Sequence, residues 1–320
     1  MTATLHLGFN HAQQQRLSMA FAKRILLFLL LNFLVVFMIS IVLNLLNIRQ
    51  YLTANGIDYR SLLLFCLIWG MGGAFISLGL SRIMAKWAMG VQIIDPHTKN
   101  PDEAQLLHTI YALAKQAQLP TMPQVGLFRS NEPNAFATGP TRSRSLVAVS
   151  TGLLNRMTPD EVKAVLGHEI SHVANGDMVT MTLLQGVVNA FVMFLARVLA
   201  FTLSGFGKSR EQGSNSGASS FILLTWLFEI IFMIFGSMLV CAYSRFREFR
   251  ADAGGAKLAG KQNMIDALKA LQTAQNIQDP RTEQPAMAAF KISHPGPKGL
   301  LRLFATHPPL ETRIERLRAM

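Results

Sequence analysis

Residues 158–177 read TPDEVKAVLGHEISHVANGD, and this stretch predicts one long helix with a defined start and end. Thr158 followed by Glu161 is the capping-box pattern of a helix N-terminus. Gly176 is suited to end the helix, and Asp177 can cap the helix that follows. The apolar side chains in between recur at the spacing of one buried helical face, at Val162, Val165, Leu166 and Ile170. The stretch therefore predicts a helix that packs into a core.

His168 and His172 are four residues apart in this helix, so both imidazoles project from one face. The spacing suits two ligands of one zinc ion, and the adjacent Glu169 suits a general base that takes a proton from zinc-bound water. The same residues could instead be two surface histidines beside a solvated glutamate. A chance His-Glu-x-x-His match in a chain of this composition is on the order of 1%. We therefore interpret the pattern as the site of one catalytic Zn²⁺ per chain.

A catalytic zinc site needs a third protein ligand and an open position for water. Glu248 is the best candidate, because a downstream carboxylate completes two histidines in one known type of zinc site. Asp252 follows one helical turn later and could accept the free N–H of a zinc-bound histidine. Glu248 could instead pair only with Arg245 or neutralise the neighbouring arginines. Spacing alone leaves other candidates for the third ligand, namely Asp252, His294, His307 and Glu229.

The composition is that of a membrane protein, since 50% of the 320 residues are hydrophobic and only 15% are charged. Four apolar segments are long enough to cross a bilayer as helices: residues 25–46, 61–80, 178–203 and 221–243. Cations that flank these segments and face anionic lipid headgroups explain the net charge of +12. We therefore expect the lipid bilayer as a partner and no nucleic acid.

Two further features exclude other classes of protein. Cys66 and Cys241 both lie in apolar segments, so we expect neither a disulfide framework nor a cysteine zinc site. Gly207-Lys208-Ser209 lacks the glycine that a P-loop places five residues earlier, so we expect no nucleotide.

The flanking cations also predict the orientation in the membrane. More of them border the segment ends that share a side with the two chain termini, which places both termini and the polar regions in the cytoplasm. The predicted organisation is a transmembrane hairpin (1–83), a first part of a polar domain (84–177), a second hydrophobic hairpin (178–243) and a second part of that domain (244–320). Polar residues in the second hairpin could face a cavity, pair with each other or mark helices covered by protein: Gln185, Asn189, Arg197 and Glu229.

The predicted fold class is a mainly α membrane protein. It combines four hydrophobic transmembrane helices with a cytoplasmic zincin-like α+β protease domain that contains a small, partly antiparallel sheet. Strands are expected at 124–128 and 145–150. Helices are expected at 101–118, 159–175, 263–275 and 310–318.

Three separated motifs resemble the bacterial HtpX family of membrane zinc proteases, which is related to the CAAX prenyl proteases. They are HEISHVANGDM at 168–178, REFRAD at 247–252 and NAFATG at 134–139, and the resemblance covers nearly the whole chain. It implies a zinc endopeptidase of the bacterial inner membrane whose active site faces the cytoplasm. The implied role is quality control of damaged or misfolded membrane proteins during stress. The resemblance also implies that Glu248 is the third zinc ligand and that Asp252 supports a ligand.

The resemblance gives roles to two further segments. It implies that Asn134, Ala135 and Phe136 lie along the active-site cleft, where an extended substrate adds to a sheet edge. On sequence alone, this segment favours a turn. The resemblance also implies that His307 and Arg313 approach the site and stabilise the oxyanion of the tetrahedral intermediate. Without it, the tail favours a surface helix with Arg313 solvated.

The expected function is hydrolysis of peptide bonds in membrane proteins or unfolded polypeptides by zinc-promoted water, with Glu169 moving the proton. One alternative is a CAAX-type prenyl-protein protease, but four hydrophobic segments argue against the large enclosed chamber that it needs. Another is a non-enzymatic membrane transporter or scaffold with structural zinc, supported only by Glu229 and Arg197. A structural zinc site has four protein ligands, whereas the motif offers three and a base.

Overall fold

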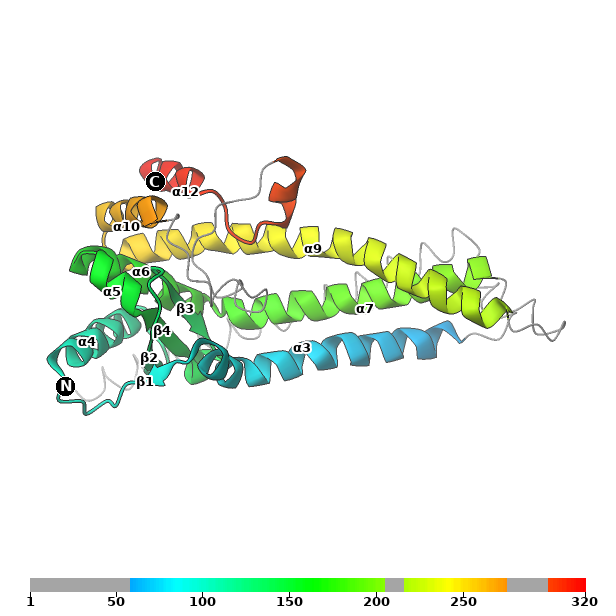
Figure 1. The fold of residues 1–320 in the computed structure, drawn as a ribbon, viewed down its shortest axis with the longest axis horizontal. Helices are drawn as coiled ribbons and strands as arrows, with labels where there is room; N and C mark the ends of the chain where they lie inside the picture. Colours follow the sequence, from blue (N-terminus) through cyan, green and yellow to red (C-terminus); the bar gives the residue numbers. More distant parts are fainter. Residues whose placement is uncertain (1–57, 205–215, 275–298) are drawn as a thin grey trace, which may run out of the picture. The chain divides into compact units, whose positions relative to one another are not determined.

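The computed structural model describes residues 58–204, 216–274 and 299–320 (Figure 1). The chain forms two compact units. The first comprises Met1–Gly72 and Gln185–Met233, and the second comprises Gly73–Leu184 and Ile234–Met320.

Among the described residues, three helices are apolar enough to cross a membrane, which confirms three of the four predicted spans by length and composition. They are α3 (Tyr59–Met89), α7 (Asp177–Ser204) and α9 (Ser216–Ala259), the long helices of Figure 1. Each is longer than its apolar segment, because the helical backbone continues into polar sequence. The predicted span at 25–46 lies outside the described residues.

In the first unit, α3 and α7 pack around four buried side chains, those of Cys66, Phe194, Val198 and Phe201. Gly70 permits this approach, because a Cβ there would lie 2.6 Å from a backbone nitrogen of α7. Arg197 of α7 pairs with Glu229 of α9 at an Nη1–Oε1 distance of 2.6 Å. Gln185 donates a hydrogen bond to Asn189 at 2.8 Å. Of the roles considered for these four polar residues, pairing is the one that the contacts support.

The second unit contains a four-stranded sheet in the order β1-β2-β4-β3. Its strands are β1 (Gln92–Ile93), β2 (Gln124–Phe128), β3 (Ala135–Thr138) and β4 (Leu146–Ser150). β2 and β4 are parallel, whereas β1 and β3 pair antiparallel with β2 and β4. The prediction of a small, partly antiparallel sheet is confirmed, but only β2 and β4 were located. β1 and β3 have two and four residues, too few for an alternating pattern to be recognised.

The central strand β4 is buried along its whole length. Val147 and Val149 contribute to the main core, which also includes the apolar face of the predicted zinc helix. Ala148 points the other way, into a smaller cluster with Phe128 and Phe136. Both faces of the sheet are therefore covered, as expected for an apolar central strand.

In the described part of the second unit, a group of further helices packs beside this sheet. They are α4 (Pro101–Gln116), α5 (Thr151–Arg156), α6 (Pro159–Asn175), α10 (Lys261–Thr273) and α12 (Leu310–Arg318), with 3-10 helices η1 (Arg142–Arg144) and η4 (Gly299–Phe304). The predictions for α6 and α12 are correct at both ends. α4 ends two residues before the predicted 118, because Gln118 adopts a left-handed φ of 55°. α10 begins and ends two residues before the predicted bounds of 263–275. α6 packs against α4, α10 and β3, which places the histidine helix beside the edge strand of the sheet.

Candidate metal centre

The two histidines are positioned by α6, whose ends form as its sequence predicts. The Thr158 hydroxyl accepts a hydrogen bond from the backbone N–H of Glu161, and the Glu161 carboxylate accepts one from the backbone N–H of Thr158 at 2.8 Å. Gly176 adopts a φ of 65° and ends the helix. His168 and His172 lie on the buried face, only 3% and 7% exposed.

Glu248 reaches the histidines because α9 approaches α6 at a pair of glycines. A Cβ on Gly254 would lie 2.4 Å from Oγ and 2.7 Å from Cβ of Ser171. A Cβ on Gly255 would lie 3.0 Å from the backbone nitrogen of His168. Without side chains at these positions, the two helix backbones approach closely enough for the Glu248 carboxylate on α9 to meet the imidazoles.

Replacing Gly254 with Val should weaken the site without changing a ligand. The added side chain would displace Ser171 and push α9 away from α6. We expect zinc affinity to fall at least about tenfold and the free energy of unfolding to fall by about 1–3 kcal/mol. Zinc titration calorimetry and thermal unfolding in detergent would measure both. Gly79→Val is the control, since a Cβ there meets nothing within 4 Å. Wild-type zinc affinity in Gly254→Val would contradict this role of the close approach.

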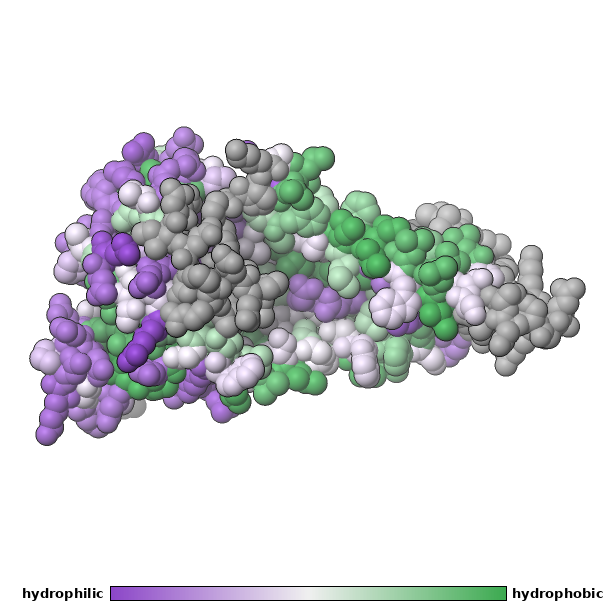
Figure 2. Space-filling model, viewed as in Figure 1, coloured by the Kyte–Doolittle hydropathy of each residue, from purple (hydrophilic) through white to green (hydrophobic). Residues whose placement is uncertain are grey.

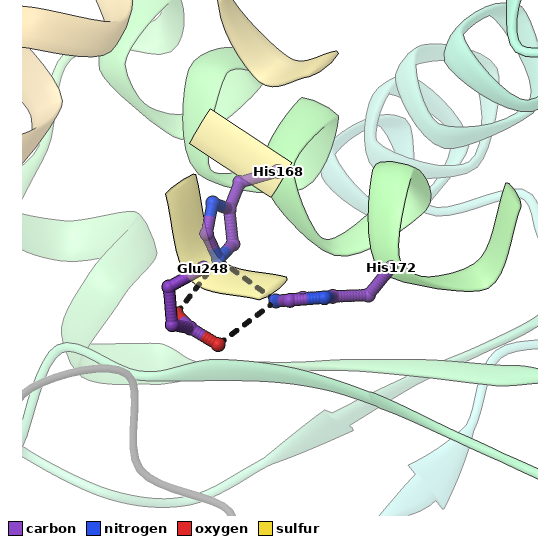
Figure 3. A group of neighbouring side chains, drawn as sticks. All are labelled: His168, His172 and Glu248. Carbon is purple, nitrogen blue, oxygen red and sulfur yellow. Dashed lines mark hydrogen bonds and ion pairs between the residues drawn. The ribbon is translucent and has the colours of Figure 1, made fainter. Parts of the chain in front are cut away.

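The side chains of His168, His172 and Glu248 converge at their ligand atoms (Figure 3). Nε2 of His168 lies 3.1 Å from Nε2 of His172 and 3.5 Å from Oε2 of Glu248. Nε2 of His172 lies 3.3 Å from Oε1 of Glu248. Donor atoms that are each about 2.0–2.1 Å from a tetrahedral zinc ion are about 3.3 Å apart. All three sides of this triangle therefore match the dimensions of a zinc site.

The Glu248 carboxylate lacks hydrogen-bond donors among the described residues, with Arg247 and Arg313 at 3.7 and 3.9 Å from its oxygens. It is fully buried. A buried charge without donors is costly unless a counter-ion compensates for it. In the described part of the chain, no other cluster of three or more His, Cys, Asp or Glu side chains has this ligand spacing. The residues present therefore fit a zinc ion held by two imidazoles and one carboxylate.

Each histidine is oriented by a carboxylate on its other ring nitrogen. Nδ1 of His168 lies 2.9 Å from Oδ1 of Asp252, and Nδ1 of His172 lies 2.7 Å from Oδ2 of Asp177. Such contacts fix the tautomer that leaves Nε2 free to bind a metal. Asp177 also accepts a hydrogen bond from Arg250 at 2.7 Å. Sequence reasoning assigned Asp177 only a capping role, although a carboxylate five residues after a ligand and just past the helix end could have indicated this contact.

These carboxylates raise the pKa of both histidines. Burial by itself lowers the pKa of His168, but Asp252 and Glu248 outweigh burial and raise it to about 9. Burial likewise lowers the pKa of His172, but Glu248 and Asp177 outweigh it and raise the pKa. An environment that favours a proton on each imidazole also favours a divalent cation. Zinc binds the deprotonated nitrogen, so metal binding here should release protons.

Arg313 lies next to His168, on the side of the ring that carries Nδ1. Its guanidinium makes two hydrogen bonds to Asp252, from Nε to Oδ2 at 2.8 Å and from Nη2 to Oδ1 at 2.6 Å. Burial by itself lowers the pKa of Arg313, but Asp252, Glu248 and Glu169 outweigh burial and raise it, so the guanidinium stays charged. This geometry supports a positioning role through Asp252. The oxyanion contact that the resemblance implies for Arg313 stays a prediction.

Replacing Arg313 with Lys should lower zinc affinity about 10- to 100-fold, the usual cost of disturbing a group that orients a metal ligand. Lysine keeps the positive charge beside Asp252 but cannot make both hydrogen bonds. Zinc titration against a fluorescent chelator would measure the change. Arg318→Lys on the same helix is the matched control, because its side chain is exposed. Equal zinc affinity of the two variants would remove Arg313 from the support of the site.

His307 lies next to Glu248, before α12. Its Nδ1 is 2.8 Å from Oε2 of Glu248, without hydrogen-bond geometry, and its side chain is 19% exposed. His307 is therefore close enough to act at the metal site. Two other candidates for the third ligand have other contacts, since Asp252 supports His168 and Glu229 pairs within the first unit. His294 lies outside the described residues.

The predicted substrate-binding residues lie in and before β3. Asn134 is buried, and its backbone N–H donates to Oγ of Ser150 at 2.9 Å. Ala135 and Phe136 are also buried, with the Phe136 ring packed on Phe128 at a centroid distance of 5.6 Å. The segment is thus a strand and not the turn that its residues alone favoured. Its side chains belong to the core, so a substrate that pairs with this edge strand would meet its backbone.

Comparison with known proteins adds an independent finding. Residues 100–320 match peptidase family M48. The chain is 48% identical over 300 residues to "Protease HtpX" of Thioalkalivibrio sulfidiphilus, covering 93% of this chain and 99% of that protein. It is 49% identical over 304 residues to "Protease HtpX homolog" of Bacillus licheniformis, covering 93% and 99%. Its fold is similar to the crystal structure of S. mikatae Ste24p, with a TM-score of 0.56 and 19% identity over 91% of this chain. The chain spans 66% of that structure, and this similarity concerns the fold alone.

Proposed function

The chain belongs to peptidase family M48 and is a membrane metalloprotease, and on that premise we propose that it is a zinc-dependent endopeptidase for misfolded or damaged membrane proteins. We place it in the bacterial inner membrane, with the active site and both termini in the cytoplasm. The excess of cations on one side of the apolar segments supports this orientation. Unfolded polypeptides would also be substrates, because an extended chain is what an edge strand can bind.

The observation that carries the proposal is the buried triangle of ligand atoms. Two Nε2 atoms and one carboxylate lie 3.1 to 3.5 Å apart. Both ligand histidines have a carboxylate on Nδ1. Three protein ligands leave a fourth tetrahedral position for water, which distinguishes a catalytic zinc site from a structural one. The scaffold and transporter alternative offers no reason for a general base beside such a site.

The proposed mechanism divides the work among the residues of the site. His168, His172 and Glu248 would hold the zinc ion. When bound, zinc would make water acidic enough to yield hydroxide near neutral pH and would polarise the scissile carbonyl. Glu169, adjacent to His168 and 5% exposed, would accept the proton of the attacking water and pass it to the leaving amine. His307 would donate a hydrogen bond to the oxyanion as it forms.

Two membrane helices support the choice of substrate class. Asp177, which orients His172, is the first residue of α7. Glu248 lies in α9, which is continuous with the apolar residues from 219 onward. The site is thus built at the polar ends of helices that would span the bilayer. A polypeptide that emerges from the membrane next to these helices would reach the site over a short distance.

The test is reconstitution of activity. The protein is purified in detergent, stripped with a chelator, and assayed for cleavage of casein with and without added zinc. Cleavage that depends on zinc supports the proposal, and a zinc-loaded protein that leaves casein intact contradicts it. A prenylated peptide and its unprenylated form, assayed in parallel, test the CAAX-type alternative. Cleavage of only the prenylated peptide would favour that alternative.

A further inference from the structure

The 3-10 helix η4 has an exposed apolar surface. Leu300 is 84% exposed and Leu301 is 62% exposed, while Leu303 and Phe304 are each 38% exposed. None of its residues is buried. A protein surface in water seldom carries so many large apolar side chains in a row, and such a patch marks an interaction site. The surface therefore requires an apolar partner.

This surface is fixed against one turn of α9. Nη1 of Arg245 donates hydrogen bonds to the carbonyl oxygens of Leu303 at 3.0 Å and Ala305 at 2.7 Å. Sγ of Cys241 donates to the carbonyl oxygen of Phe304 at 3.3 Å. These bonds satisfy carbonyl groups at the end of η4. Figure 1 shows η4 beside α9, as these contacts require.

The turn of α9 that binds η4 is the turn at which arginines begin to interrupt its apolar surface, with Phe246 still 53% exposed just beyond it. Phe235 and Leu239, which precede it, are 63% and 58% exposed. The cations Arg245, Arg247 and Arg250 follow. With a rise of about 1.5 Å per residue, Leu239 and Arg245 are only about 9 Å apart along the axis. Figure 2 shows hydrophobic residues over η4 and over the adjoining part of α9. η4 thus lies at the level where α9 would pass from hydrocarbon to headgroups.

We propose that η4 is a membrane-surface anchor that inserts Leu300 and Leu301 into the bilayer that α9 spans. Two observations favour a bilayer as the partner. The apolar surface of η4 is continuous with the apolar surface of α9, and Arg302 within η4 is exposed beside Arg245. Apolar side chains next to arginines suit the boundary between acyl chains and anionic headgroups. The proposal depends on the membrane location of the chain and not on the proposed peptidase chemistry.

The anchor connects directly to the metal site. Only Ala305 and Thr306 separate η4 from His307. Phe304 contacts α9 at Cys241, Ala305 contacts it at Arg245, and His307 contacts it at Glu248. The segment and α9 therefore run in the same direction, with contacts along two turns. Insertion of η4 into lipid would hold the start of this segment and so help to fix the position of His307.

The experiment places a fluorescent probe on the anchor. Leu301→Cys is made in a Glu169→Gln chain, so that self-cleavage cannot interfere, with Cys66 and Cys241 replaced by Ser. Serine at 241 keeps a donor for the Phe304 carbonyl. The labelled protein is reconstituted into vesicles of phosphatidylethanolamine and phosphatidylglycerol. Lys269→Cys on α10 is the matched control, because Lys269 is exposed and its amine pairs with Asp266, three residues away on the same helix.

The expected result is that spin-labelled lipids quench the probe at 301 and that aqueous iodide quenches it several-fold less than the probe at 269. Equal iodide quenching at the two positions would overturn the proposal. A probe at 301 that is protected from both quenchers would also overturn it, because protein and not lipid would then cover η4. Replacing phosphatidylglycerol with phosphatidylcholine should reduce lipid quenching if Arg302 contacts anionic headgroups. Quenching that persists unchanged after this replacement would contradict the contact of Arg302 with anionic headgroups.

Discussion

Replacing Glu169 with Gln should lower kcat for casein cleavage by about 10²- to 10⁴-fold, the usual contribution of a general acid–base group. Glutamine has nearly the same shape but cannot accept the proton of the attacking water. Zinc content should stay at one ion per chain, because the ligand triangle consists of His168, His172 and Glu248 alone. The result expected for a base is therefore a protein that binds zinc normally and does not cleave.

The measurement pairs metal analysis of the purified protein with initial rates of casein cleavage. Glu315→Gln is the matched control, since this glutamate is exposed on α12. It should cleave at the wild-type rate with the wild-type zinc content. If Glu169→Gln cleaves as fast as this control, the mechanism proposed above is wrong. If it loses zinc as well as activity, Glu169 holds the metal and is not simply a base.

The parts of the fold that could be predicted are those whose determinants are local in the sequence. α6 begins at a capping box and ends at a left-handed Gly176, so both of its ends could be read from a few neighbouring residues. The long apolar helices were recognised for a similar reason, since about 20 apolar residues are sufficient to span a bilayer. β3 was not recognised as a strand, because its four residues become one only by pairing with β4.

The residues of the candidate site likewise fall into those that local sequence predicts and those that depend on the packing of distant segments. His168, Glu169 and His172 follow from helical spacing, which is a local property. Spacing leaves Glu248 as one of several candidates and only the resemblance singles it out, because nothing local shows that Gly254 and Gly255 let α9 approach α6. The contacts of Asp177 with His172 and of Arg313 with Asp252 depend on how distant segments pack. Sequence patterns rarely show contacts of this kind.

The structure also gives Arg313 and His307 different surroundings, although sequence reasoning treated them as a pair. Arg313 is 1% exposed and bonded to Asp252. The side chain of His307 is 19% exposed and contacts Glu248. A residue that meets an oxyanion must reach the open side of the metal, so His307 is the better candidate for that role. Arg313 is better placed to hold Asp252, and through it His168, in a fixed orientation.

Replacing Glu248 with Ala should lower zinc affinity by about 10²- to 10³-fold, since zinc-site binding free energies of about 10–16 kcal/mol are shared among roughly four ligands. The loss follows from two effects. The triangle loses its only charged ligand, and the cation then lies near the Arg313 guanidinium, whose Nη1 is 3.9 Å from Oε2 of Glu248 in the wild type. Casein cleavage at limiting zinc should fall in proportion. Competition with a fluorescent chelator would measure the affinity.

Asp252→Asn provides the graded comparison for this prediction. Asparagine can still accept the Nδ1–H of His168 through its carbonyl oxygen, but it has no negative charge, so we expect a smaller loss of zinc affinity, of about 10- to 100-fold. Glu248→Ala leaves only two zinc ligands, whereas Asp252→Asn keeps all three and weakens the support of one. Glu248→Ala should therefore bind zinc more weakly than Asp252→Asn. The order wild type, Asp252→Asn, Glu248→Ala in decreasing affinity follows from the geometry. If Glu248→Ala retains wild-type zinc affinity, Glu248 leaves the ligand set.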